Sequence, residues 1–283
     1  MMPTKVMSLV APYLIKKAIN SDRRHDIFHP SAWGACLRKV AFEFYNEKHH
    51  FYKRSPTDVN LRFELIFDNG HGVHSRWQKY LDNANVLRGT WKCPNPECGK
   101  VWGLDSPLGI FNPVRFGLPK VAAAGQFSCL CGNKTELDYH EVVVTSDKEF
   151  NLKGSVDAIV DVRGPLGQDK PAAQGEVFVV DFKSCKSTYF DEIVHAKWEH
   201  VVQIHIYMWL LGLDMGVVLY ECKDDQKVKE MPVPRDPALI ERIKTESKWL
   251  LSVLEANKMP PIPSGFSQSK IPCYFCEFTN RCY

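Results

Sequence analysis

Hydrophobic positions recur every three to four residues between positions 57 and 83, and this spacing predicts a long helix. The apolar stripe of that helix consists of Phe63, Phe67, Gly70, His74, Trp77 and Leu81. Farther along, apolar and polar residues alternate over residues 141–146, 154–162 and 176–184, and a two-residue period predicts strands. His74 thus lies on a stripe that the pattern otherwise assigns to the core.

The second half of the chain adds further helices and strands. Its patterns predict helices near 189–195 and 199–213, strands near 216–222 and 228–233, and a final helix over 237–256. The order is that of a mixed α/β protein, and the sequence has no internal repeat and no low-complexity tract.

The second and third predicted strands carry acidic residues. Alternation places Asp157 and Asp161 on one face of the second strand, and Asp181 with Lys183 on one face of the third. Buried charge is unfavourable without a partner. Two carboxylates and the His74 imidazole would form a pocket suited to Mg²⁺ or Mn²⁺, in which Lys183 steadies negative charge or the attacking water. The alternative is a strand-end salt bridge between Asp181 and Lys183, with His74 an ordinary core histidine.

The helix after these strands carries Gln203 and Tyr207 four residues apart, so both side chains project from one face. Glutamine offers hydrogen-bond donors and an acceptor, and tyrosine offers a ring and a hydroxyl. The neighbouring positions form a stripe typical of core packing, namely Val202, Ile206, Trp209 and Leu210. The order of the pair, after Asp181 and Lys183, connects it to the predicted site.

Composition narrows the class of protein. The chain has 283 residues, 45% hydrophobic and 24% charged, which fits one large domain or one domain with an insertion. Because 36 basic residues face 33 acidic ones, the net charge of +3 creates no global field for a polyanion. The longest apolar stretch is interrupted by Asp214, so we expect no membrane helix. Pro12 interrupts the first apolar stretch and Lys16 follows it, unlike a signal peptide, so we expect a reducing cytoplasm.

Four cysteines in the middle of the chain form two pairs, each followed by a glycine. Cys93 pairs with Cys98, and Cys129 pairs with Cys131. Tight turns of this kind let two thiolates reach one ion, so we predict a structural zinc site. Spacings of four and one residues differ from the commonest spacing of two, which leaves a loop of free thiols as the alternative. We interpret residues 90–140 as an inserted zinc-binding subdomain, folded by ligation more than by burial.

Three further cysteines lie at the C-terminus, after a proline-rich arm. Cys273, Cys276 and Cys282 have the spacing of metal ligands, and Cys36 is the natural fourth. We define residues 259–283 as the arm and the cluster-ligand segment. Spacing alone leaves an iron-sulfur cluster and zinc about equally supported.

Five short motifs in this order resemble a known nuclease family. They are Gly-x3-His ending at His74, Gly-x2-Asp ending at Asp157, Asp-x-Lys at Asp181 and Lys183, Gln-x3-Tyr at Gln203 and Tyr207, and the bracket of Cys36 with the C-terminal cysteines. The set resembles the RecB-like branch of the PD-(D/E)XK nucleases, in its iron-sulfur subclass of AddB-type nuclease domains and CRISPR-associated exonucleases. The cysteine insertion between the first two motifs is a departure from that pattern.

The resemblance implies one RecB-like nuclease domain over residues 1–283, with a central mixed sheet flanked by helices. It makes His74, Asp157 and Asp181 ligands of Mg²⁺ or Mn²⁺, together with the carbonyl of Phe182. It makes Lys183 the water-orienting or charge-stabilising residue, and Gln203 and Tyr207 supports for the site and the DNA. Asp181 stands where glutamate is commoner. The resemblance also favours a 4Fe-4S cluster at the C-terminal cysteines.

These features predict a metal-dependent DNA exonuclease that acts at single-stranded ends in recombination, repair, replication or CRISPR adaptation. The sequence lacks a Gly-x4-Gly-Lys-Ser/Thr motif, so ATP-driven unwinding would need a helicase, recombination or CRISPR partner protein. We expect a bacterial, archaeal or phage-infected cell. The alternatives are a catalytically idle nucleic-acid-binding adaptor and an RNA-processing nuclease.

A basic and aromatic segment follows Cys36. Its cationic residues are Arg38, Lys39, Lys48, His49, His50, Lys53 and Arg54, and its aromatic residues are Phe42, Phe44, Tyr45, Phe51 and Tyr52. This mixture is typical of single-strand binding, where phosphate attraction joins base stacking. The alternative is a helix with a solvated basic side and an apolar core side.

Overall fold

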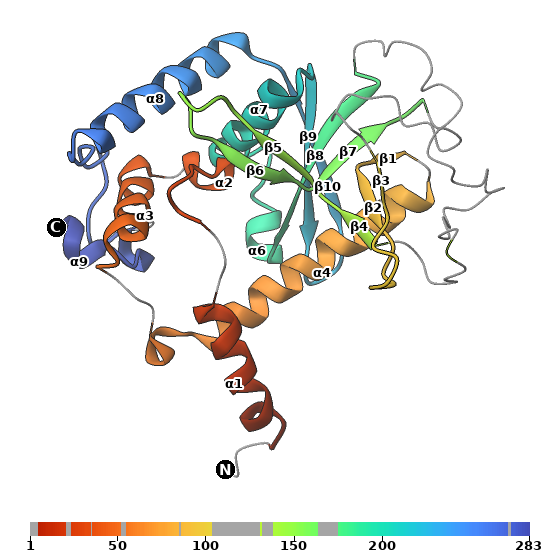
Figure 1. The fold of residues 1–283 in the computed structure, drawn as a ribbon, viewed down its shortest axis with the longest axis horizontal. Helices are drawn as coiled ribbons and strands as arrows, with labels where there is room; N and C mark the ends of the chain where they lie inside the picture. Colours follow the sequence, from red (N-terminus) through yellow and green to blue (C-terminus); the bar gives the residue numbers. More distant parts are fainter. Residues whose placement is uncertain are drawn as a thin grey trace.

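A computed structural model describes residues 5–20, 24–34, 36–51, 55–84, 86–103, 131, 138–163, 175–270 and 273–283. The central sheet has five strands in the order β1-β7-β8-β9-β10 (Figure 1). Their bounds are β1 Leu87–Arg88, β7 Ala158–Asp161, β8 Val177–Cys185, β9 Met215–Cys222 and β10 Val228–Pro234. The β8–β9 pair is parallel and the other pairs are antiparallel, so the sheet is mixed as predicted.

Helices cover both faces of this sheet, because β8 is apolar on both sides. Val179 belongs to a core cluster shared with α7 (Trp198–Leu211). Phe182 belongs to a second cluster that the half-buried Trp77 of α4 (Leu61–Asn83) packs against. The predicted alternation along this strand is therefore confirmed, and the sheet is the middle layer between α7 and α4.

A third core cluster lies on the outer side of α7. It holds residues of α2 (Pro30–Trp33), α3 (Leu37–His49), α7 and α8 (Pro237–Glu255). Asp236 caps α8, because its carboxylate accepts hydrogen bonds from the backbone N–H of Ala238 at 2.8 Å and of Leu239 at 3.3 Å. This cluster fixes α7, and with it the polar residues that α7 carries.

Smaller elements surround the central sheet. Strands β5 (Val142–Thr145) and β6 (Lys153–Val156) form a hairpin, and β2 (Thr90–Lys92), β3 (Val101–Gly103) and β4 (Asp138–His140) form a separate sheet. The remaining elements are α1 Lys5–Ile19, η1 Pro56–Asp58, α6 Ser187–Phe190, η2 Cys273–Phe275 and α9 Thr279–Cys282. Helix α1 stands away from the body and contacts α4 and η1 (Figure 1).

Three predicted elements differ from the structure. The strand expected over 154–162 bends at Asp157, so that β6 pairs with β5 whereas β7 joins the central sheet. The helix expected near 189–195 is the single turn α6, and the helix expected from position 57 begins at Leu61. Asn60 sets that start, since its side chain accepts a hydrogen bond from the backbone N–H of Arg62 at 3.0 Å.

Helix α1 was not expected, since Pro12 interrupts the apolar pattern; the structure places Pro12 inside the helix. No helix among the described residues combines the length and the apolar character that crossing a membrane requires.

Candidate active site

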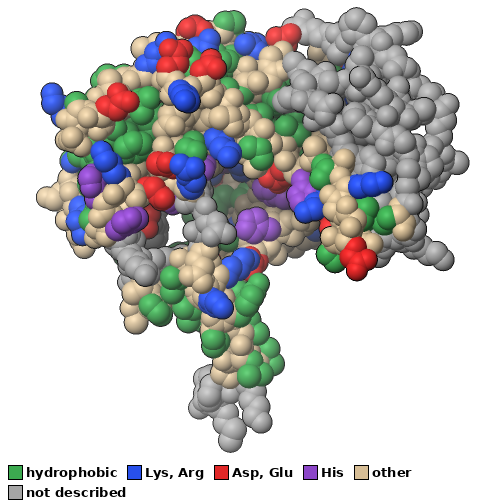
Figure 2. Space-filling view, in the orientation of Figure 1, with side chains coloured by type: hydrophobic (Ala, Val, Ile, Leu, Met, Phe, Trp, Pro, Cys, Tyr) green, Lys and Arg blue, Asp and Glu red, His purple; other side chains and the backbone are tan. Residues whose placement is uncertain are grey.

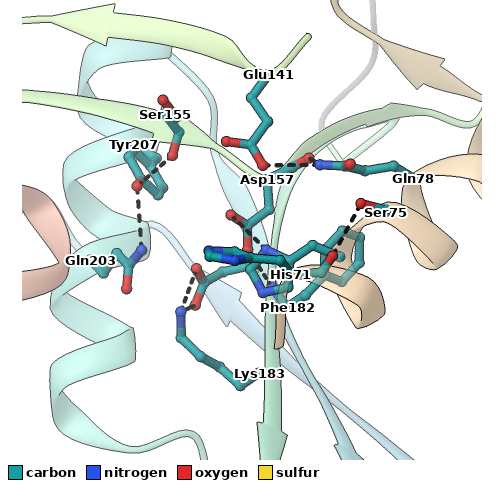
Figure 3. A network of polar contacts seen from close by, with 12 residues as sticks. His71, Ser75, Gln78, Glu141, Ser155, Asp157, Phe182, Lys183, Gln203 and Tyr207 are labelled. Atoms are coloured by element: carbon teal, nitrogen blue, oxygen red, sulfur yellow. Dashed lines mark hydrogen bonds and ion pairs between the residues drawn. The ribbon is translucent and has the colours of Figure 1, made fainter. Parts of the chain in front are cut away.

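The predicted polar residues meet where the β5–β6 hairpin reaches the central sheet (Figure 3). Asp157 lies at the bend between β6 and β7, and Asp181 lies in the middle of β8. His74 comes from α4, and Gln203 and Tyr207 come from α7. Elements from both sides of the sheet therefore contribute to one pocket.

Asp157 holds the pocket together through both carboxylate oxygens. Its Oδ2 accepts a hydrogen bond from the backbone N–H of Phe182 at 2.8 Å, and its Oδ1 lies 3.5 Å from Nδ1 of His74. The backbone bends at Asp157, so the Asp157 side chain, and not a backbone carbonyl, accepts the hydrogen bond from β8 at this position. Burial raises the pKa of Asp157 to about 6, although the Lys183 ammonium opposes that rise.

Asp181 is fully buried and forms an ion pair with Lys183. The Lys183 ammonium lies 2.8 Å from Oδ1 and 2.7 Å from Oδ2 of Asp181. Burial raises the pKa of Asp181 to about 7, and the Asp157 carboxylate adds to the rise against Lys183. The predicted alternative, a salt bridge, thus describes this contact correctly, but the pair lies beside Asp157 in the pocket and not at an isolated strand end.

His74 is half-buried, and its surroundings favour the neutral form of its imidazole. Burial lowers its pKa, and the Lys183 ammonium lowers it further. Its ring packs edge-on against Phe182, with the ring centroids 5.7 Å apart. A neutral imidazole held in this way has a lone pair available for a metal ion.

Glu141 belongs to the pocket and was not identified from the sequence. Ligand atoms of His74, Glu141 and Asp157 all lie within 4.8 Å of one another. Burial raises the pKa of Glu141. The hairpin register pairs Val142 with Val156, so Glu141 is the next position opposite Asp157. That signal was present in the sequence, but using it required knowing that the two strands form a hairpin.

Gln78 was also missed, and it positions two of these groups. Its Nε2 donates a hydrogen bond to Oε1 of Glu141 at 3.0 Å and to the backbone carbonyl of Asp157 at 2.8 Å. It lies four residues after His74 on α4, so both side chains face the pocket. The sequence signal for Gln78 was its position four residues after His74, which places both side chains on one face of a helix.

Gln203 and Tyr207 brace the strand that leads to Asp157. Gln203 Nε2 donates to the Tyr207 hydroxyl at 3.3 Å, and that hydroxyl donates to the Ser155 carbonyl at 2.7 Å. Burial raises the pKa of Tyr207, which keeps its proton in place for this bond. At Gly154 a Cβ would lie 3.1 Å from the Tyr207 ring and 2.9 Å from the Pro30 ring, so this strand approaches α7 closely.

Asp161 lies outside the pocket, although the predicted alternation aligned it with Asp157. It is fully buried and forms ion pairs with Arg88 and with Arg163, the latter at 2.8 Å. The bend at Asp157 breaks the two-residue period, so the two aspartates do not share a site.

The donor set fits a hard divalent cation. Carboxylates just before β5, at the bend between β6 and β7 and within β8, together with one imidazole, offer oxygen and nitrogen ligands. Burial raises the pKa of both Asp157 and Asp181, so their ionised forms are unfavourable without a nearby cation. Mg²⁺ and Mn²⁺ favour such ligands and would offset the cost of burying these charges.

Residues 115–283, more than half of the chain, match the family model of the PD-(D/E)XK nuclease superfamily. The chain belongs to this superfamily. The match confirms both the predicted family and the predicted α/β class, with helices on both sides of a mixed sheet.

The individual relatives share only 14–26% sequence identity with this chain. The CRISPR-associated exonuclease Cas4 of Saccharolobus solfataricus is 26% identical over 129 residues, which cover 44% of this chain and 57% of that protein. The chain thus spans little more than half the length of this curated relative. The alkaline exonuclease LHK-Exo of Laribacter hongkongensis is 21% identical, with a TM-score of 0.34 over 42% of this chain and 57% of that one. The structure of SSO0001 is 14% identical, with a TM-score of 0.46, and the match covers 100% of this chain and 98% of that one.

Three of the four central cysteines lie together in the nuclease. Ligand atoms of Cys93, Cys98 and Cys131 are within 4.8 Å of one another, and the sulfurs of Cys93 and Cys131 are 3.8 Å apart. The Gly99 amide donates to the Asn95 carbonyl at 3.0 Å, and Gly99 has a φ of 54°. This tight turn is the one predicted for a metal-binding knuckle. Cys129 lies outside the described residues.

The terminal cysteines gather between α3 and the C-terminal segment. Burial raises the pKa of Cys36, and the nearby Cys273 and Cys282 thiols raise it further. Burial also raises the pKa of Cys276, and Cys36 contributes to that rise. Arg38 Nε donates to the sulfur of Cys282 at 3.2 Å. Cys36 therefore lies near the C-terminal cysteines, although the four sulfurs, all within the described part of the chain, do not form a group within 4.8 Å as those of Cys93, Cys98 and Cys131 do.

The aromatic residues after Cys36 are used in packing. Phe42 stacks on Phe278 with ring centroids 5.2 Å apart, and Phe44 lies 6.2 Å from Phe28. The Tyr45 hydroxyl donates to backbone carbonyls near the end of α8. These contacts favour the alternative, a helix with an apolar core side. Tyr52, Lys53 and Arg54 lie outside the described residues.

Proposed function

We propose that this chain is a metal-dependent DNA exonuclease that trims single-stranded ends. The observation that carries the proposal is the convergence of His74, Glu141, Asp157, Asp181 and Lys183 in one partly buried pocket. An idle adaptor would gain nothing from carboxylates whose burial is unfavourable without a cation. The Cas4 relative is named as an exonuclease, which supports the same choice.

His74, Asp157 and Asp181 would hold Mg²⁺ or Mn²⁺, with the Phe182 carbonyl as a further ligand, and the closeness of Glu141 to His74 and Asp157 supports including it in the proposed set. When bound, such an ion polarises a phosphoryl oxygen and lowers the pKa of water.

The protein groups around that ion have separate tasks. Lys183 places a positive charge beside Asp181, where it would orient the attacking water or stabilise charge developing on the phosphate. Gln78 orients Glu141, and Tyr207 fixes the strand before Asp157. The chemistry therefore depends on preorganised polar contacts from α4 and α7.

Two further metal centres belong to the proposal. A 4Fe-4S cluster would be held by Cys36, Cys273, Cys276 and Cys282, and would join the two ends of the described chain. Zinc would be held by Cys93, Cys98, Cys129 and Cys131, and would order the subdomain over residues 90–140. Both groups would be structural, because neither belongs to the acidic pocket.

DNA is the proposed substrate, and a helicase, recombination or CRISPR protein is the proposed partner. The name of the Cas4 relative supports a CRISPR setting in a prokaryotic cytoplasm.

Digestion of end-labelled DNA tests the proposal. Purified protein is incubated with linear single strands, linear duplex and circular single strands, each with Mg²⁺, Mn²⁺ or EDTA. We expect shortening of linear single strands that requires the divalent ion, with the circle intact. Persistence of every DNA substrate, with or without degradation of a matched RNA, would contradict the DNA exonuclease.

A further inference from the structure

Helix α4 exposes two phenylalanines on the side that carries the metal ligand His74. Phe63 is 45% exposed and Phe67 is 60% exposed. The hydrophobic pattern placed both on a core stripe, but in the structure the core contacts of this stripe come from the half-buried Trp77 and Leu81, nearer the end of the helix. Contiguous exposed apolar side chains mark interaction sites in soluble proteins, and these two rings are one helical turn apart.

The geometry of the helix aligns these rings with the pocket. Steps of four, four and three residues separate Phe63, Phe67, His71 and His74, so the four side chains share one face. At about 1.5 Å per residue, Phe67 lies roughly 10 Å and Phe63 roughly 16 Å from His74 along the axis. Figure 3 shows His71 among the residues of the pocket. At roughly 3.4 Å per nucleotide along one stacked strand, the rings lie about three to five nucleotides from the predicted metal ion.

Basic groups lie beside this face. Helix α1 contacts α4 where Lys17 pairs with Asp68, and the exposed Lys16 of α1 adds a further positive charge. The His71 side chain is 75% exposed. In the space-filling view a hollow opens beside these helices, and histidine, basic and acidic side chains lie around it (Figure 2).

We propose that Phe63 and Phe67 form a stacking platform for the bases of a single strand whose end occupies the metal pocket. The inference rests on the proposed function and names a positioning element for it. Unpaired bases have free faces for an aromatic ring, whereas the bases of a duplex are already stacked on one another. The platform would therefore favour single strands and would keep the scissile phosphate in register with His74.

Binding measurements without cleavage test the platform. Fluorescence anisotropy of a labelled 20-nucleotide thymidine strand, with Ca²⁺ in place of Mg²⁺, compares the parent with the Phe63→Ala/Phe67→Ala variant. Because each stacked base contributes roughly 5- to 150-fold, loss of both rings predicts single-strand affinity at least about 30-fold weaker. The control is Leu65→Ala, which removes a side chain of similar exposure, 46%, from the opposite side of α4; its affinity should stay within about twofold. Phe67→Trp keeps a ring and should retain the parent affinity.

A cleavage assay separates this inference from the proposed function. With Mg²⁺, the double variant should show a higher KM for the 20-mer, while a thymidine dinucleotide, too short to reach Phe67, should be cleaved as by the parent. A parent that binds the strand through these rings but cleaves nothing would refute the proposed activity and keep the platform. Equal affinity of the double variant and the Leu65→Ala control, or a changed oligomeric state in sedimentation with unchanged DNA binding, would overturn the platform.

Discussion

Asp157 shows how single contacts assemble the pocket. Its side chain takes the place of a backbone ladder bond where β6 ends, and it thereby lies between His74 and the backbone of Phe182. The neighbouring Glu141 is fixed by Gln78, which also binds the Asp157 carbonyl. One amide side chain thus sets the relation between two candidate metal ligands.

Removal of that amide should weaken metal binding. In Gln78→Ala we expect Mn²⁺ affinity, measured by calorimetry, to fall roughly 10- to 100-fold, as is typical for the loss of a group that orients a ligand. Ser75→Ala, one turn earlier on α4 and exposed, is the control and should bind Mn²⁺ as the parent does. Equal affinities of the two variants would show that Glu141 takes no part in the metal site.

The buried carboxylates also predict a pH dependence of stability. The folded pKa values of Asp157, about 6, and Asp181, about 7, exceed the unfolded values near 4. Between about pH 4 and 7 the folded state therefore binds more protons than the unfolded state, so these groups make the metal-free protein less stable as pH rises. Mn²⁺ competes with those protons, so its affinity should increase from pH 5.5 to pH 8.

Thermal melts of protein dialysed free of Mg²⁺ and Mn²⁺ measure this effect. Asp181→Asn, which cannot ionise, should be about 1–4 kcal/mol more stable than the parent at pH 8 and should lose that advantage at pH 4. A variant less stable than the parent at pH 8 would show that the Asp181 carboxylate is already compensated by Lys183.

At the scale of elements, the strands and their ends position the acidic residues, and helices α4 and α7 supply the polar side chains that hydrogen-bond around them. Alternation in β8 was predictable, because a strand buried on both faces keeps its two-residue period. The bend at Asp157 could not be predicted, because it depends on a hydrogen bond with Phe182, a residue distant in the sequence. Glu141 and Gln78 were missed for the same reason: their roles arise from hairpin register and helix packing, which a single-chain pattern does not specify.

Helix α7 and strand β6 are coupled through one hydroxyl, and its removal is a further prediction. Tyr207→Phe leaves the Ser155 carbonyl and the Gln203 amide without their partner. We expect a loss of about 1–3 kcal/mol in the free energy of unfolding, measured in urea, and a lower kcat. Tyr189→Phe, at an exposed tyrosine, should change neither. Full activity with unchanged stability in Tyr207→Phe would refute the bracing role.

At the scale of the whole molecule, cysteines from the two ends of the chain meet beside α3. Helix α9 lies beside α3 (Figure 1). Phe42 stacks on Phe278, and Arg281 donates to the Phe51 carbonyl at 3.2 Å. Arg38 also binds the Pro260 carbonyl, and Met259 packs against the third core cluster. Ligation of a cluster would close a loop from Cys36 to Cys282 and add to these contacts.

Metal analysis and a cysteine variant test this closure. Protein purified without oxygen should contain about four irons and one zinc per chain. Cys36→Ala should lose the iron, melt at least about 5 °C lower and release the arm to protease, as expected when a cross-link across a long loop is lost. Cys185→Ser removes a thiol outside both cysteine groups and should keep the iron. Two zincs and no iron would contradict the cluster, and normal melting of Cys36→Ala with no activity would contradict its structural role.

The most direct test of the central claim, that this acidic pocket hydrolyses DNA with a divalent ion, is digestion of an end-labelled single strand by matched variants in Mn²⁺. The parent should shorten the strand. Asp181→Ala and Lys183→Ala should leave it intact while still binding it, because each removes a group needed for the chemistry more than for affinity. Asp225→Ala, which removes an acidic residue from an exposed turn, should cleave as the parent does. Undiminished cleavage by Asp181→Ala or by Lys183→Ala would contradict the assignment of this pocket as the active site.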